Sequence, residues 1–177
     1  MSSPDPQELR FDGVRIRIDS DNSYEHLVAA LRAEVGETPE SITELPTAFF
    51  NDWGSFSTEI TRYLGSSDFM LMHLIDHGEW LQTAGINRKA LRVILGNPLI
   101  SVTMLRHDLT AGLFAPVELL LLEEDNNRSS VTYIKPSSQI VIEDNPPLQA
   151  AAQALDAKLA ALTAKLTASK SSTLESA

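Results

Sequence analysis

The sequence of 177 residues contains no cysteine. It therefore cannot form a disulfide bond, a zinc–thiolate site, an iron–sulfur cluster or a thiol nucleophile. A domain without disulfide bonds must be held together by its hydrophobic core, and 43% hydrophobic residues suffice for one core. We expect a single domain in a reducing compartment, the cytoplasm.

Long apolar runs and basic residues are also scarce. No run approaches the about 20 apolar residues of a membrane-spanning helix, and the polar segment 1–12 lacks the features of a secretory signal. The 14 Lys and Arg residues stand against 24 Asp and Glu residues, which gives a net charge of −10. This charge repels DNA and anionic membranes, so we expect no nucleic-acid or membrane partner. No nucleotide-binding glycine motif or H-E-x-x-H motif is present, and we expect no cofactor.

The first half of the chain predicts one strand and two helices before a second strand. In residues 14–19, Val14, Ile16 and Ile18 alternate with charged residues, which is typical of a half-buried strand. Polar capping residues, a helical apolar face and a terminal Gly36 then predict a helix over 23–35. The following segments are a loop, 37–46, an aromatic-rich helix, 47–64, and a strand, 69–75.

The second half predicts a hairpin and a long final helix. Its segments are a helical turn at 79–84, a strand at 90–95, a short helix at 99–106, strands at 117–123 and 130–134 joined by a turn at 125–128, an edge segment at 140–142, and a helix from 146 to about 169. A stripe repeats by four and three along the last helix: Leu148, Ala152, Leu155, Leu159, Leu162 and Leu166. Such a stripe packs on the sheet or forms a dimer interface.

These elements predict an α+β fold, with a small antiparallel β-sheet packed by helices on one face and a long C-terminal helix. We expect a flexible arm over 1–12, a single domain over 13–168, and a frayed tail over 169–177.

Several motifs in order resemble those of the family called domain of unknown function 302. They are Ile75-Asp76-His77, Leu95-Gly96-Asn97-Pro98, Leu113-Phe114-Ala115-Pro116 before Val117-Glu118-Leu119-Leu120, and Val131-Thr132-Tyr133 followed by Pro136. The strand and helix of 14–35 also fit the family layout. The resemblance implies a helix-grip fold related to that of the TATA-binding protein, and often a homodimer. The activity of the family is not established, and residues 37–67 resemble an elongated, aromatic-rich insertion.

His77 is the titratable residue of greatest interest. At the end of a strand it can serve as an acid, a base or a ligand, with Asp76 fixing its tautomer. The alternative, which we favour, is that Asp76 caps the following turn and His77 is structural. His73 has the parity of His77 on a strand, so the two could converge on a metal ion, but a third ligand is not evident. We therefore predict no metal site.

Other candidates are polar or aromatic groups around a cavity. Gly96 and Asn97 precede a helix whose free N–H groups suit an anion, although capping by Asn97 explains them better. The Tyr133 hydroxyl points into a cavity or only covers the core. Trp53 and Phe56, in the aromatic helix, are ordinary core residues or the wall of an apolar pocket.

Two hypotheses of different class follow. The first is a protein, expected to be a homodimer, that binds a small and largely apolar ligand in a cavity between the sheet and the helices. The second is a cofactor-free lyase or isomerase in which His77 is the acid or base and Asp76 orients it. A homodimeric interaction scaffold is a third alternative. The site hypotheses assume that residues 73–77 and 96–98 face one shared cavity.

Overall fold

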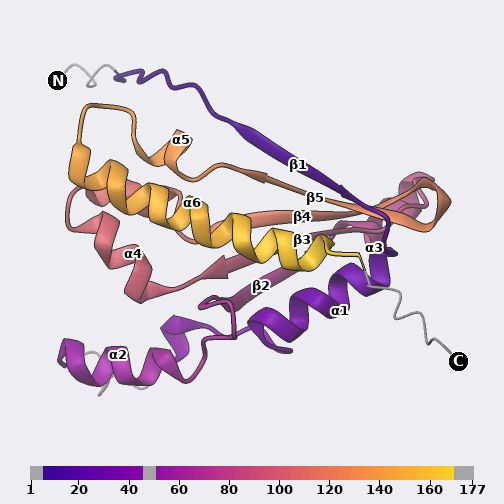
Figure 1. The fold of residues 1–177 in the computed structure, drawn as a ribbon, viewed down its shortest axis with the longest axis horizontal. Coiled ribbons are helices and arrows are strands. Elements are labelled where there is room, and N and C mark those ends of the chain that lie inside the picture. Colours follow the sequence, from indigo (N-terminus) through magenta and orange to yellow (C-terminus); the bar gives the residue numbers. More distant parts are fainter. Residues whose placement is uncertain (1–5, 46–50, 170–177) are drawn as a thin grey trace, which may run out of the picture.

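The computed structural model describes residues 6–45 and 51–169 and contains one antiparallel sheet of five strands. The spatial order of the strands is β1-β5-β4-β3-β2, as Figure 1 shows. Their bounds are β1 Arg15–Ser20, β2 Met70–Asp76, β3 Ala90–Gly96, β4 Val117–Glu124 and β5 Arg128–Ile134. The first strand to be synthesised therefore lies at one edge and the second lies at the other.

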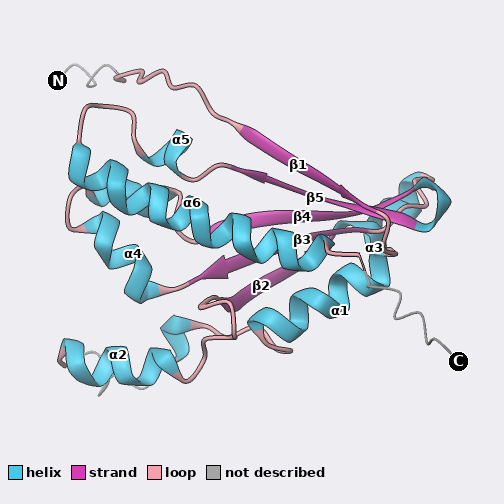
Figure 2. Ribbon diagram, viewed as in Figure 1, coloured by secondary structure: helices cyan, strands magenta, loops and turns pink. Residues whose placement is uncertain are grey.

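Six α-helices accompany the sheet in the described residues (Figure 2). They are α1 Tyr24–Val35, α2 Trp53–Thr61, α3 His77–Leu81, α4 Pro98–Leu105, α5 Ser137–Ile140 and α6 Pro146–Thr167. Short 3-10 turns lie at Ile42–Glu44, Gln82–Ala84, Leu109–Leu113 and Asp125–Asn127. The predicted fold class is confirmed. None of these helices is both long enough and apolar enough to span a membrane, as judged over the described residues.

The sheet has one covered face and one open face. Leu91, Val93 and Leu95 of β3 are buried, whereas Arg92 and Ile94 between them are only partly buried. The covered face packs against α1, α4 and α6, and its apolar residues form one core cluster with the buried residues of these helices. We call it the helix-covered face, and the other the open face. This alternation follows from the period of two along a strand.

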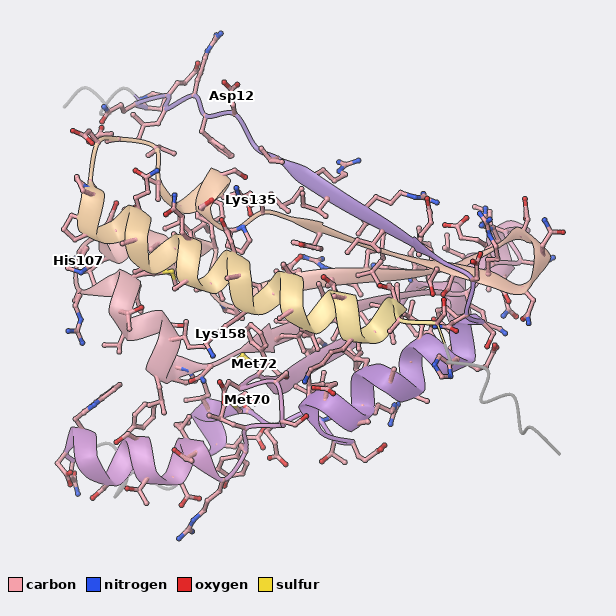
Figure 3. The ribbon with its side chains drawn as sticks, viewed as in Figure 1. Asp12, Met70, Met72, His107, Lys135 and Lys158 are labelled. Carbon is pink, nitrogen blue, oxygen red and sulfur yellow. The ribbon has the colours of Figure 1, made fainter. Side chains whose placement is uncertain are left out.

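The leucine stripe of α6 packs within the subunit. All six stripe residues are at most 3% exposed and belong to the core cluster. Burial of each leucine contributes on the order of 2 kcal/mol. Lys158 (Figure 3) adds an ion pair with Asp68 at 2.6 Å, and Lys165 adds one with Glu34 at 2.9 Å. The stripe is therefore not available as a dimer interface in this fold.

Three predicted elements differ from the structure. The aromatic helix is Trp53–Thr61 rather than 47–64, because Asp52 caps it by accepting a hydrogen bond from the Ser55 N–H at 2.8 Å; residues 47–50 lie outside the described part. Segment 140–142 is not a strand, because the chain turns through α5 there. The helical turn begins at His77, directly after β2, rather than at Glu79.

Candidate functional site

The first candidate site is an apolar pocket of about 320 Å³ between α2, α4 and the ends of β2 and β3. We call it the α2–α4 pocket. Its lining consists of Ile42, Trp53, Phe56, Met72, Gly96, Asn97, Pro98, Ser101, Val102, Leu105, Ala115 and Pro116. Most of these side chains are apolar, and none is ionisable. The pocket therefore suits a small uncharged group rather than an ion.

The turn from β3 into α4 builds the floor of this pocket. Asn97, which is 6% exposed, caps α4 by accepting a hydrogen bond from the Leu99 N–H at 2.8 Å. Its amide group donates to the Asp68 carbonyl, also at 2.8 Å. Both polar ends of the side chain are thus occupied within the protein. The predicted capping role is confirmed, and Asn97 has little hydrogen-bonding capacity left for a ligand.

Gly96 has no side chain, and this leaves room for Met72 in the wall of the pocket. A Cβ atom at this position would lie 2.4 Å from the sulfur of Met72, which is on β2 (Figure 3). A β-bulge between Leu71 and His73 places Met72 at this point. A larger residue at position 96 would push the flexible methionine side chain into the cavity.

Two rings of α2 form the opposite wall. The Trp53 and Phe56 ring centroids lie 5.6 Å apart, and Trp53 remains 52% exposed. They lie three positions apart, which places both rings on one side of the helix. Ile60, fully buried one turn later, anchors the other end of α2. The ring pair thus stands at the mouth of the pocket with α2 fixed behind it.

The second candidate site is a pocket of about 400 Å³ on the open face. We call it the open-face pocket. Its lining consists of Arg15, His77, Arg92, Glu118, Leu119, Leu120, Thr132, Tyr133 and Ile134. The Arg92 guanidinium binds the Glu118 carboxylate through Nε at 2.8 Å. The charges of these two groups cancel, so Arg15 supplies the remaining fixed positive charge.

His77 reaches this pocket from α3. Gly78 lets the helix rest on β3, because a Cβ atom there would lie 2.9 Å from the Arg88 carbonyl oxygen. The imidazole also contacts the ring of Trp80 edge-on, with centroids 5.9 Å apart. The position of His77 is therefore set by the packing of a short helix.

Asp76 does not accompany His77. Its carboxylate caps α3 by accepting a hydrogen bond from the Glu79 N–H at 3.1 Å. It lines a separate groove on the helix-covered face with Tyr24, where burial and the nearby Asp76 charge raise the pKa of the tyrosine to about 12. The favoured interpretation of Asp76 as a cap is confirmed. Asp76 has no contact with the His77 imidazole that would support a role in orienting it.

His73 and Tyr133 complete the set of sequence candidates. His73 lies on the open face opposite Ile94, is exposed, and lines neither pocket. Tyr133 borders the open-face pocket, but its side chain belongs to the core cluster. Across residues 6–45 and 51–169, no three His, Asp or Glu side chains are placed to hold a metal ion.

The assumed shared cavity is therefore wrong. The structure brings Trp53, Phe56, Gly96 and Asn97 together in the α2–α4 pocket, and it places His77 and Tyr133 at the open-face pocket. Sequence reasoning did not identify Arg15, Arg92, Glu118 and Thr132. The available signal was their alternation with apolar residues along four strands. This pattern shows that they share a face, not that they converge.

Comparisons with known proteins agree with the fold. A family model described as domain of unknown function DUF302 matches residues 48–166, more than half of the chain. The match includes the second part of segment 37–67 and excludes segment 14–35. A crystal structure of an uncharacterized conserved protein DUF302 from Bacillus stearothermophilus matches with a TM-score of 0.60 and 17% identity, covering 86% of this chain and 97% of that one. No curated protein matches.

Proposed function

The chain belongs to the DUF302 family, whose function is unknown, and from this premise we propose that it binds a small, largely apolar molecule in the α2–α4 pocket. The carrying observation is that four residues selected from sequence line one uncharged cavity of about 320 Å³. Such cavities, mostly apolar with few polar groups, are the usual binding sites for small molecules.

The recognition chemistry follows from the walls. The polar groups of Asn97 are engaged within the protein, and Ser101 donates to the Asn97 carbonyl at 3.1 Å. Binding therefore rests on shape, apolar contact and the face of Trp53, rather than on new hydrogen bonds. An uncharged aromatic or aliphatic molecule is the matching class, because an anion or cation would find no partner in the pocket.

The two tryptophans allow a direct test with the neutral fluorophore 1-aminoanthracene. Trp53 and Trp80 are the only tryptophans, so the Trp80→Phe variant reports on the α2–α4 pocket and the Trp53→Phe variant reports near the open-face pocket. We expect saturable quenching of Trp53 and little effect on Trp80. Quenching of Trp80 alone would exclude the α2–α4 pocket as the binding site.

A filled pocket supplies the matched comparison. In the Trp80→Phe background, Val102→Phe places a ring into the cavity, and we expect the affinity for 1-aminoanthracene to fall at least about tenfold. Thr103→Phe adds the same ring to an exposed neighbour on α4, and we expect unchanged affinity. Equal effects of the two variants would contradict the proposal.

A second proposal concerns His77 as an acid or base, with Arg15 and Thr132 available to a substrate in the open-face pocket. The observation in its favour is that these side chains line one cavity. His77→Gln should then abolish turnover of any substrate found by screening and leave the fold intact, whereas Asp76→Asn should change stability more than turnover. Retained turnover in His77→Gln would end this proposal.

Three further features remain proposals. The long helix α6 lying across an antiparallel sheet supports a helix-grip arrangement. The cysteine-free sequence supports a cytoplasmic location. A homodimer is the third, and its interface must lie elsewhere than on the buried stripe of α6.

A further inference from the structure

The two edge strands of the sheet differ in how well their outer backbone groups are protected. Along β2, the Glu40 N–H donates to the Leu71 carbonyl at 2.8 Å, and a bulge interrupts the strand beside it. Crossing segments and bulges are common means of protecting an edge strand. Along β1, six residues continue without a bulge, and the described residues supply no backbone partner on the outer side.

The register shows which groups of β1 face outward. Lys135 donates its N–H to the Val14 carbonyl at 2.8 Å, so Val14 belongs to a hydrogen-bonded pair with β5. Hydrogen-bonded pairs alternate along an antiparallel ladder. The N–H and C=O groups of Ile16 and Ile18 therefore also point to β5, whereas those of Arg15, Arg17 and Asp19 point away from the sheet.

We propose that β1 pairs antiparallel with β1 of a second copy about a two-fold axis at Ile18, so that the two sheets become one. In this register Arg17 lies opposite the partner subunit's Asp19, and Asp19 lies opposite the partner subunit's Arg17. The two pairs exchange four backbone hydrogen bonds. Arg15 faces the partner subunit's Asp21 just beyond the strand.

Charge decides between the possible registers. A shift of two residues in one direction sets Arg17 opposite the partner subunit's Arg17, and a shift in the other direction sets Asp19 opposite the partner subunit's Asp19. Like charges directly opposite each other destabilise a sheet, and opposite charges stabilise it. A shift of one residue would turn apolar side chains to the open face. The register about Ile18 avoids both problems.

The same register fits the helix-covered face. Ile18 is half-buried and packs against the core cluster, and it meets the partner subunit's Ile18 across the axis. Arg17 already pairs with Asp19 at 2.8 Å and Glu124 at 3.0 Å on the open face. The charges that would protect an edge against random pairing thus select one self-complementary partner.

This inference deepens the homodimer proposal and is independent of ligand binding. Amide hydrogen exchange by NMR on the full chain tests it directly. At low protein concentration the amides of Arg15, Arg17 and Asp19 should exchange fast, and those of Ile16 and Ile18 slowly. At high concentration we expect exchange at Arg17 and Asp19 to slow more than about tenfold. Fast exchange at Arg17 and Asp19 under conditions in which sedimentation equilibrium shows a dimer would overturn the interface alone, and a monomer at every concentration would overturn the homodimer as well.

Substitutions provide a second measurement. Arg17→Pro removes an outward N–H that the monomer does not use, so the fold should persist while dimerisation is lost. Asp19→Arg should also give a monomer, and the exchanged variant Arg17→Asp with Asp19→Arg should restore the dimer. Glu8→Arg makes the same charge change on the exposed arm and should leave the dimer intact. A dimer that survives both Arg17→Pro and Asp19→Arg would contradict the proposal.

Discussion

The two pockets of this protein are built by opposite means. The α2–α4 pocket is formed by neutral side chains around one helix cap, and it depends on a buried amide that binds backbone on both sides. The open-face pocket is formed by long charged side chains that cross neighbouring strands, with Arg92 bound to Glu118. The first is a property of backbone geometry, and the second is a property of strand register.

This difference separates the two proposed activities. An uncharged cavity favours binding through apolar contact, because a charged transition state would find no stabilising group there. A pocket with guanidinium, imidazole and hydroxyl groups can move protons or hold charge. Perturbing the cap should therefore affect binding, and perturbing charge should affect only the open face.

The largest expected effect is that of Asn97→Ala. This variant removes the α4 cap and leaves the Asp68 carbonyl without its donor, so we expect the free energy of unfolding to fall by about 3 kcal/mol. Urea denaturation measures it. Asp108→Ala removes another side-chain cap, which accepts from the Thr110 N–H at 2.8 Å on an exposed turn, and should cost only about 1 kcal/mol. Equal losses would show that the hydrogen bond from the Asn97 side chain to the Asp68 carbonyl contributes nothing to stability.

Gly78→Ala should have the next largest effect and should alter only the open face. The new methyl group would meet the backbone that leads into β3, at the Arg88 carbonyl oxygen, which cannot move aside as a flexible side chain can. We expect a loss of about 2 kcal/mol in the free energy of unfolding. Trp80, which contacts His77, should report the displacement of α3 by a change in its emission. Binding of 1-aminoanthracene near Trp53 should stay as it was, and its loss would mean that the pockets are coupled.

Gly96→Ala should show the reverse pattern, with a small loss of stability and a clear loss of affinity in the α2–α4 pocket. The obstacle is the terminal sulfur of Met72, which can rotate away. We expect the free energy of unfolding to fall by less than about 1 kcal/mol. Binding of 1-aminoanthracene should weaken, because Met72 moves into the cavity. Fluorescence titration and urea denaturation of the same preparation separate the two quantities. A large loss of stability without a change in affinity would contradict this account.

The smallest expected effect is that of Glu124 on stability at acidic pH. A hydrogen bond from Ser130 and the charges of Arg88 and Arg17 lower the pKa of Glu124 below its ordinary value of 4.5. Its stabilising contribution is therefore present above pH 4.5 and is lost as the pH falls through the lowered pKa. Glu124→Gln should flatten the acid side of the stability profile and cost less than about 1 kcal/mol at neutral pH. An unchanged profile in this variant would show that Glu124 does not contribute to the loss of stability in acid.

Much of the fold was accessible from sequence because its signals are local. Alternation gave β1 within one residue, and the Gly36 stop and the Asn97-Pro98 cap gave the relevant ends of α1 and α4. The length of α2 was overestimated because aromatic spacing continues across Asp52, whose capping makes the helix begin only at Trp53. The end of β2 was predicted within one residue, but the start of α3 was placed at Glu79 rather than His77, because no periodicity marks a strand that passes directly into a helix.

The sites were only partly accessible for the same reason. Gly96 and Asn97 lie in a turn whose geometry is local, so their role as a cap could be predicted. Their meeting with Trp53 and Phe56 depends on how α2 packs beside α4, which sequence spacing does not encode. Convergence in the open-face pocket depends on how strands far apart in the chain pair with one another, which the local spacing of residues does not reveal.

The burial of α6 has a consequence for biosynthesis. The ribosome makes every other described helix and strand before this helix, yet α6 covers the sheet and contributes seven buried residues. Until it emerges, the nascent polypeptide exposes an unfilled apolar sheet that is prone to association and open to chaperones. Completion of the domain is thus deferred to the end of its translation, and a ribosome that stalls before residue 146 would release an aggregation-prone fragment.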